Sequence, residues 1–555
     1  MDILNPRTKR TFALPEAISL LVYCILLAWC IPHHESWFDE AQAWLIARDS
    51  TLRDLLLHRL HYEGAPALWH LLLWAEVRLH VSFLGMHYIT GAISAFGIYV
   101  WLRFSPLPRI LTLLVPFTFF LQYQYAVIAR SYNLFPLLAF ILFALYQNRK
   151  SSPISFCVVA GLLANVSLHS AAFAAGAILF YAADRLHLQR EGSTAVSRRQ
   201  LSVSAIVLLL AFGLSAFVAR PTSDGSFGNP VVQKIRSEMP GSAHEVKAEP
   251  LADTPVELPP ADQGRIAGKI WRAVNPPANA SHRAVIEGKL VKHLFEVPTA
   301  LTAPISVSNS LAVLFLVLLA LNLTRQRLWL SLAPYALVLF VFVCIQGASH
   351  HLGMLWIGLL CSVWALSIEP VSSNEASHVP RSALYLVMLI VILLQIGWSI
   401  HCLQADVFGA YSPDKETAVF ISRQPAGTRI AAFDLDSITA NAYLPRSRYF
   451  NQRVSYWPFS KTSDPSLRIQ QTMAQRPDMV IESLTISEHP YINQWLTLTT
   501  PGTRDYDRAT FSLLAQDGYR ETHRFCGEHL FRNSSEQMVC SVILEPGAAG
   551  TSSAR

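Results

Sequence analysis

Long apolar stretches separated by short polar segments fill residues 1–403 of the chain. A helix needs roughly 17 to 25 mostly apolar residues to cross a bilayer. About eleven such stretches can be placed, at 14–32, 84–102, 110–126, 133–147, 154–168, 171–184, 201–219, 306–323, 328–346, 352–368 and 382–402. The pattern predicts a polytopic α-helical membrane protein with about eleven transmembrane helices.

Basic residues cluster in every second connecting segment. They are Arg7, Lys9, Arg10, Arg103, Arg109, Arg149, Lys150, Arg185, Arg190, Arg198, Arg199, Arg325, Arg327 and Arg381. The positive-inside rule makes these segments cytoplasmic, together with the N-terminus. An odd number of spans then leaves 33–83, 220–305 and 404–555 on the opposite side. We therefore expect an integral protein of a bacterial inner membrane or a plasma membrane, with an extracytoplasmic C-terminal domain.

Composition supports the membrane assignment. Of 555 residues, 52% are hydrophobic and 15% are charged, whereas soluble domains carry about 25% charged residues. The net charge of +6 resides mostly in short loops, which argues against nucleic acid as a partner. The eight cysteines form no C-x-x-C pair, and no dedicated metal-ligand set is visible. The sequence predicts no metal site, and it leaves a requirement for a divalent cation open.

The two other long extracytoplasmic segments, 220–305 and 404–555, are predicted to differ in structure. The loop 220–305 is proline-rich and irregular, with a short amphipathic helix expected at 281–296. The tail 404–555 alternates strand-like runs with helix-like stretches, so we expect a small α/β domain. Its strands are expected at 429–433 and 479–481 and a helix at 465–474.

Two pairs of residues in the tail suggest chemistry. Cys526 and Cys540 both lie outside the membrane in this topology, which favours a structural disulfide. Asp434 and Asp436 follow a hydrophobic strand, as in metal-dependent nucleotide-sugar transferases. A strand followed by a polar turn is the simpler interpretation, because nucleotide sugars are not expected outside the membrane.

The first extracytoplasmic loop, 33–83, contains an adjacent acidic pair, Asp39 and Glu40, on a predicted surface helix. Adjacent helical side chains point about 100° apart, so at most one is the principal catalytic carboxylate. The alternative is a capping box, in which Ser36 caps the helix and Asp39 complements its dipole. Pro66 then starts a further apolar helix that is too short to span and fits the membrane interface.

The order of these features resembles the GT-C superfamily of membrane glycosyltransferases. An outside Asp-Glu pair is followed by Gly64-Ala65-Pro66 with Trp69, and then by the stretch from Tyr125 to Tyr132. The chain is most similar to the protein O-mannosyltransferase and lipid A aminoarabinose transferase group, most clearly over 15–185. The resemblance implies a GT-C-like fold and a polyprenyl-phosphate sugar donor. It also implies inversion at the anomeric carbon, with Asp39 as general base and Glu40 beside it.

Arginines and histidines near the outer ends of spans are the candidate substrate-binding residues. A guanidinium at such a depth suits phosphate binding, although it can also snorkel to the interface. Histidines beside lipid can bind a ligand or act as interface anchors. The candidates are Arg130, Tyr132, Arg48, Arg59, His350 and His351.

The sequence therefore predicts an integral-membrane glycosyltransferase, with a polyprenyl-phosphate sugar as donor and an extracytoplasmic protein, lipid or glycan as acceptor. The alternative is a transporter or lipid-binding membrane protein without transferase activity. Transporters tend to carry charges at mid-membrane in broken, repeated helices. Here the predicted spans are nearly free of charge, which favours chemistry at one interface.

Overall fold

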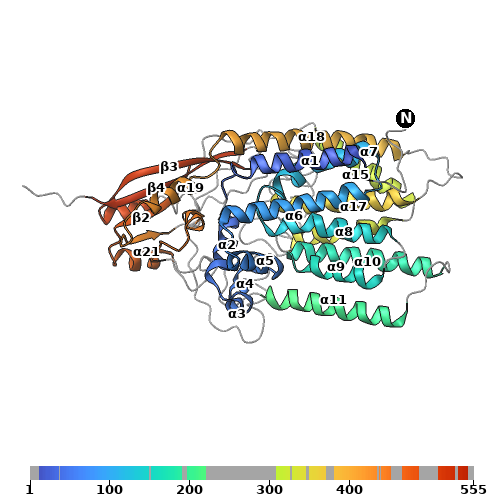
Figure 1. Cartoon of the computed structure of the whole chain (residues 1–555), viewed down its shortest axis with the longest axis horizontal. Coiled ribbons are helices and arrows are strands. Elements are labelled where there is room, and N and C mark those ends of the chain that lie inside the picture. Colours follow the sequence, from blue (N-terminus) through green and yellow to red (C-terminus); the bar gives the residue numbers. More distant parts are fainter. Residues whose placement is uncertain are drawn as a thin grey trace, which may run out of the picture.

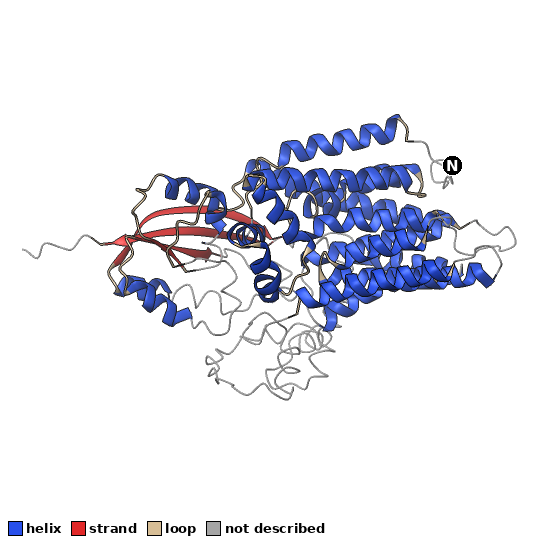
Figure 2. Cartoon of the chain, turned by 60° about the horizontal axis from the view of Figure 1, so that its bottom comes forward, coloured by secondary structure: helices blue, strands red, loops and turns tan. Residues whose placement is uncertain are grey.

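A computed structural model covers the whole chain and shows a helical bundle with a β-sheet unit at one end (Figure 1). Figure 2 shows the same division, with the strands at the end of the molecule away from the N-terminus. The structure describes residues 12–36, 38–148, 152–190, 197–220, 308–325, 328–344, 349–369, 381–433, 437, 439–451, 465–486, 510–531 and 535–547. Apart from Arg220, the loop 220–305 lies outside these residues, together with its expected helix. Asp434 and Asp436 also lie outside them.

The bundle consists of apolar helices of 12 to 28 residues. They are α1 (Leu14–Cys30), α6 (Phe83–Phe104), α8 (Leu134–Gln147), α9 (Pro153–Ala164), α10 (Leu168–Arg190), α11 (Arg198–Val218), α15 (Ser308–Arg325), α16 (Ala333–Cys344), α17 (Leu352–Ile368) and α18 (Arg381–Phe408). Among the described residues, α6, α11 and α18 are long and apolar enough to cross a membrane by themselves. Most of α11 is uncovered by protein, and it lies at the edge of the bundle (Figure 1). The apolar face of such a helix suits contact with lipid.

The expected span at 110–126 is wrong as a single helix. The chain there forms a short helix α7 (Arg109–Leu114), a 3-10 turn η3 (Val115–Phe117) and a π-helical turn η4 (Phe120–Gln124). Pro116 explains the break, because a proline inside a helix lacks a backbone N–H and its ring clashes with the preceding turn. Hydropathy alone does not reveal such a break, because a proline inside an apolar run hardly changes the average.

Large aromatic side chains and close backbone contacts hold the bundle together. The ring of Trp101 lies 5.0 Å from that of Phe140 and 5.5 Å from that of Trp364, which joins α6, α8 and α17. A Cβ on Gly176 would lie 2.4 Å from the Pro334 nitrogen, so α10 and α16 approach closely only because this residue is glycine. Packing of this kind replaces the hydrophobic effect between helices in lipid.

Short helices of the first loop cover the end of the bundle that faces the sheet (Figure 1). They are α2 (Phe38–Asp49), α3 (Leu52–Asp54), the π-helix η2 (Leu55–Arg59), α4 (Leu60–Glu63) and α5 (Leu68–Arg78). Gly64 ends α4 with a left-handed φ of 59°, the backbone conformation that favours glycine after a helix. The side chain of Trp69 is 2% exposed and packs inside the protein.

The C-terminal part contains a four-stranded sheet of order β1-β2-β4-β3. Its elements are α19 (Asp414–Ser422), β1 (Ile430–Ala432), the 3-10 turn η8 (Ala440–Tyr443), α21 (Pro465–Met473), β2 (Met479–Ile486), β3 (Tyr519–Phe531) and β4 (Ser535–Pro546). β1 pairs in parallel with β2, and the other neighbours are antiparallel. The expected strands at 429–433 and 479–481 and the helix at 465–474 are confirmed.

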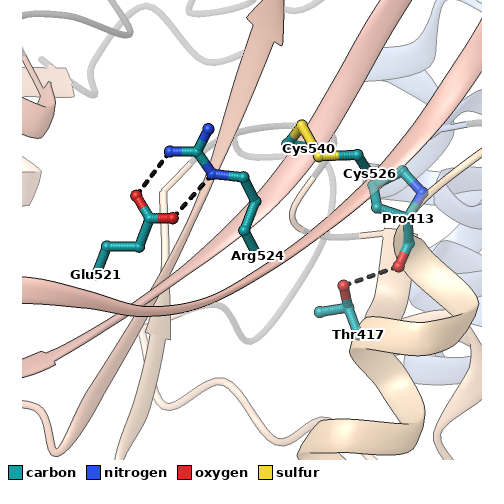
Figure 3. Close-up of a disulfide and its surroundings, with 6 residues drawn as sticks. All are labelled: Pro413, Thr417, Glu521, Arg524, Cys526 and Cys540. Carbon is teal, nitrogen blue, oxygen red and sulfur yellow. Dashed lines mark hydrogen bonds and ion pairs between the residues drawn. A yellow bond between two sulfur atoms is a disulfide. The ribbon is translucent and has the colours of Figure 1, made fainter.

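The expected disulfide is confirmed. Cys526 and Cys540 are paired across β3 and β4, and Figure 3 shows the bond beside Pro413, in the segment that joins α18 to α19. A Cβ on the neighbouring Gly527 would lie 2.7 Å from the Ser412 backbone. The hairpin therefore packs directly against this connecting segment.

The sheet unit is attached to the first loop by polar contacts. The Ser412 backbone N–H donates to Glu35 (3.0 Å), and the Ser36 N–H donates to the Tyr443 hydroxyl (2.9 Å). Arg48 Nη1 donates to the carbonyls of Asn441 (3.0 Å) and Leu444 (2.8 Å). The C-terminal part thus touches both the entry and the far end of α2.

Candidate active site

The acidic pair at the start of α2 is divided between two environments. The Asp39 side chain is 28% exposed, and its Oδ2 lies 2.7 Å from Arg130 Nη2. The neighbouring Glu40 side chain is fully buried. Because successive helical side chains point in different directions, one carboxylate faces an accessible site and the other faces the protein interior.

Arg130 has an extended backbone conformation and directly precedes the 3-10 turn η5 (Ser131–Asn133). The Arg130 N–H donates to the Asn133 side-chain oxygen (3.1 Å), and the guanidinium lies 5.1 Å above the ring of Tyr132. Burial alone would lower the pKa of Arg130, but the Asp39 carboxylate outweighs it and raises the pKa. Arg130 is therefore a fixed cation beside a partly exposed carboxylate.

Tyr132 extends this cluster to the histidines that precede α17. Its hydroxyl bonds to Nε2 of His351, and its ring lies 5.5 Å from that of His350. The ring of His351 also lies 4.0 Å from that of His169 at the start of α10. The structure thus brings together Asp39, Arg130, Tyr132, His350 and His351 from distant parts of the chain.

Glu40 is the centre of a buried polar network. Its carboxylate accepts from the backbone N–H of Ala129 (2.6 Å), lies 3.2 Å from His34 Nε2 and lies 3.1 Å from His87 Nε2. Burial would raise the pKa of Glu40, but the two histidines outweigh it and hold the pKa well below its usual range. Since Ala129 precedes Arg130, this carboxylate supports the site from behind.

His34 links that network to α18. Its Nδ1 lies 2.7 Å from Asp406 Oδ2, and the Tyr123 hydroxyl donates to the other oxygen of Asp406 (3.0 Å). Burial would lower the pKa of His34, but Asp406 and Glu40 outweigh it and raise the pKa to about 10. The site around this ring therefore strongly favours positive charge.

Glu63, at the end of α4, lies close to the pair without joining it. Gln42 Nε2 donates to its Oε1 (2.6 Å). Removal from water and the neighbouring Asp39 carboxylate raise the pKa of Glu63 to about 8. This carboxyl group is therefore largely protonated at neutral pH, and it leaves the Asp39–Arg130 pair electrically balanced.

The structure places Arg48 and Arg59 in other contacts. Arg48 forms two bonds with Asp49 (2.8 and 3.1 Å) besides those to the C-terminal part. It lies nine residues after Asp39 on α2, about 13 Å along the helix. Arg59 Nε pairs with Asp54 at 2.6 Å. Arg48 thus joins the two parts of the molecule rather than the Asp39 cluster.

The capping-box alternative is not found. Ser36 Oγ lies 3.0 Å from His87 Nε2, and the Asp39 carboxylate pairs with Arg130. Neither side chain is used to bond the first backbone N–H groups of α2 in the described part of the chain. Asp39 is therefore available for a role other than helix capping.

No family model matches the chain, and no curated protein does. Among solved structures, it is similar to ArnT from Cupriavidus metallidurans bound to undecaprenyl phosphate. The TM-score is 0.47 at 10% identity, over 95% of this chain and 97% of that one. It is also similar to ArnT from the same organism in the apo state, with a TM-score of 0.48 at 10% identity over 95% and 96% of the two chains.

Several residues of the site were missed by sequence reasoning. His34, His87 and Asp406 carry no local motif, because their contacts join residues up to 372 positions apart. Glu63 offered one signal, since it precedes the Gly-Ala-Pro turn that starts α5. Within the described residues, His34, Glu40 and His87 form a group that could hold a metal ion. Their wide spacing explains why the sequence shows no such ligand set.

The shifted pKa of Glu63 predicts a pH-dependent stability. The folded protein holds a proton that an unfolded glutamate releases above its ordinary value of 4.5. Stability should therefore fall as pH rises from about 4.5 through about 8. Glu63→Gln mimics the protonated form and should remove this part of the loss. Unfolding temperatures in one detergent at pH 5, 7 and 9 measure it.

An exposed glutamate of α19, changed as Glu416→Gln, serves as the control and should show no pH-dependent offset from wild type. For Glu63→Gln, the advantage over wild type should grow with pH. If the unfolding temperatures of Glu63→Gln and wild type differ by the same amount at all three pH values, Glu63 is already ionised in the folded protein.

Proposed function

We propose that this protein is an integral-membrane glycosyltransferase that takes its sugar from a polyprenyl-phosphate donor. The observation that carries the proposal is the pairing of a partly exposed carboxylate, Asp39, with a guanidinium, Arg130, at 2.7 Å. This pair lies at the end of an apolar helical bundle, where a lipid-linked phosphate would emerge from the membrane. The order of motifs that resembles the GT-C superfamily supports the same assignment.

Asp39 is proposed as the general base. It would take the proton of an acceptor hydroxyl as the acceptor oxygen forms a bond to the anomeric carbon, and the bond from that carbon to the phosphate oxygen breaks. The sugar configuration inverts, as the resemblance implies. A positioned base of this kind contributes about 10²–10⁴-fold to the rate.

Arg130 is proposed as the phosphate-binding residue. A planar guanidinium can bind phosphate through two parallel hydrogen bonds, and it would stabilise the charge that develops on the departing polyprenyl phosphate. In the free protein this cation is paired with Asp39. Donor phosphate would compete for Arg130 and release Asp39 to act as a base.

The neighbouring aromatic and histidine side chains would complete the substrate site. Tyr132 packs beside the Arg130 guanidinium, and the Tyr132 hydroxyl is hydrogen-bonded to His351. His350 contributes its ring to the same cluster. Glu40 is proposed to have a supporting role, because its buried carboxylate is bonded to Ala129 and the two histidines.

The reaction is proposed to take place on the extracytoplasmic side. The distribution of basic residues in the loops supports this orientation. The C-terminal part would lie on the same side, since it contacts the first loop through Arg48, Ser36 and Ser412. An extracytoplasmic protein, lipid or glycan would then be the acceptor.

Asp39→Asn should reduce sugar transfer by about 10²-fold or more, since an amide does not accept a proton as a base. The variant should remain folded, because the Asp39 side chain is 28% exposed and asparagine is nearly isosteric with aspartate. Undecaprenyl phosphate should bind at least as tightly, because Arg130 loses its competing carboxylate. Transfer is measured with a panel of radiolabelled polyprenyl-phosphate sugars and native membranes as the source of acceptor.

The matched control is Asp49→Asn, which changes an exposed aspartate at the other end of α2. It should retain most of the transfer. Substantial transfer by Asp39→Asn would remove it from the role of base. If wild type binds the donor lipid but transfers sugar from none of the polyprenyl-phosphate sugars, the result would instead favour a lipid-binding protein or transporter.

Substitutions of Arg130 should separate phosphate binding from interface anchoring. Arg130→Lys keeps the charge but loses the planar donor pair, so affinity for undecaprenyl phosphate should fall a few-fold. Arg130→Ala should lower it by about 10- to 100-fold, which corresponds to the loss of charged hydrogen bonds. Titration of the purified proteins in nanodiscs measures both values.

The control for this series is Arg103→Ala. Arg103 lies in the last turn of α6, and the variant should bind the lipid like wild type. Equal affinities of wild type, Arg130→Lys and Arg130→Ala would exclude Arg130 from the phosphate site.

A further inference from the structure

A compact group of nitrogen and oxygen ligands lies behind the Asp39–Arg130 pair. His34 follows α1, Glu40 lies on α2 and His87 lies on α6, and one ligand atom from each lies within 4.8 Å of the others. The exposed fractions of their side chains are 1%, 0% and 3%. Three distant segments thus converge on one enclosed point.

The hydrogen bonds of His34 require a positive charge at this point. Its Nδ1 faces the Asp406 carboxylate at 2.7 Å and its Nε2 faces the Glu40 carboxylate at 3.2 Å. Ionised carboxylates only accept hydrogen bonds, and a neutral imidazole has only one N–H. Either a second proton or a metal cation must therefore lie on one of the two ring nitrogens.

His87 presents a similar arrangement. Its Nδ1 lies 3.1 Å from the Phe83 carbonyl, which can only accept, so its hydrogen belongs on Nδ1. Its Nε2 then points toward Glu40 (3.1 Å) and Ser36 Oγ (3.0 Å). The lone pair of each Nε2 atom is thus directed at the same carboxylate when both rings are neutral.

The charge of the buried cluster gives the same result. Glu40 and Asp406 are both about 99% to 100% buried, and buried charges are strongly unfavourable unless they are balanced. Two imidazolium rings would balance two carboxylates, but both cations would then face the same Glu40 side chain, with ring centroids 5.7 Å apart. One divalent cation balances the same charge with neutral imidazoles.

We propose that His34, Glu40 and His87 bind one divalent transition-metal cation of the zinc type. Ligands at about 2.0–2.2 Å from a tetrahedral zinc are separated by roughly 3.3–3.5 Å. Here His34 Nε2 lies 3.2 Å from Oε2 of Glu40, His87 Nε2 lies 3.1 Å from Oε1, and one ligand atom from each residue lies within 4.8 Å of the others. The other nitrogen of each histidine faces a carboxylate or a backbone carbonyl, as is usual for histidines that bind metal. Two imidazoles and a carboxylate suit zinc better than magnesium or calcium.

Such a cation is structural, because the site is enclosed and Glu40 also accepts from the Ala129 N–H. It would join the start of α2 to α6 and, through Asp406, to α18. Asp39 and Arg130 are the direct chain neighbours of Glu40 and Ala129. Metal binding is a property of this cluster alone and does not rest on the proposed transferase activity.

The test uses the full chain, purified with a tag that binds no metal and without chelators. Elemental analysis should find about one zinc-type ion per chain after dialysis. After removal of that ion, added Co²⁺ should give a visible absorption band from cobalt bound to the two imidazoles and the carboxylate, and Zn²⁺ should abolish it. His87→Gln should lose the bound ion, whereas the exposed His523→Gln should retain it.

Asp406→Asn gives a second measurement in case a ligand variant does not fold. It leaves the three ligands in place and alters Asp406, which contacts both His34 and the Tyr123 hydroxyl, and it should weaken metal affinity by about 10- to 100-fold. A wild-type protein with neither retained metal nor a cobalt absorption band would overturn the proposal and leave the positive charge of the cluster to a protonated His34. Equal metal in wild type and His87→Gln would overturn it as adventitious binding.

Discussion

The arrangement of the site depends on one buried carboxylate, that of Glu40. A fully buried charge is tolerated only when it is balanced and its oxygens are bonded. Glu40 meets these conditions through the Ala129 backbone, His34 and His87. Because these partners come from three segments, the requirement to satisfy one charge determines where the start of α2 lies against α6 and against the segment before α8.

The position of the Asp39–Arg130 pair follows from this constraint. Asp39 precedes Glu40 and Arg130 follows Ala129, so the bond between the inner residues brings the outer ones within 2.7 Å of each other. The contacts of the C-terminal part with Glu35, Ser36 and Arg48 act on the same helix. This sheet unit therefore contributes to the position of the site although its own residues lie outside the Asp39 cluster.

The sequence predicted the features that depend on local pattern and the general order of motifs. The apolar runs located most helices, and the strands at 429–433 and 479–481 were found by composition. The grouping of Arg130, Tyr132 and His351 around Asp39 was anticipated from their expected positions at one membrane face. The break at Pro116 was missed because hydropathy averages over a proline. The network of His34, His87 and Asp406 was also missed, because contacts across 372 residues leave no periodic signal.

The central claim is that a lipid-linked phosphate binds between Asp39 and Arg130. A cryo-EM map of the full chain in nanodiscs with undecaprenyl phosphate tests it most directly. The account predicts phosphate density about 3 Å from the Arg130 guanidinium, with the Asp39 carboxylate released from the pair and facing the acceptor side. Phosphate density elsewhere, with the 2.7 Å contact between Asp39 and Arg130 intact, would contradict it.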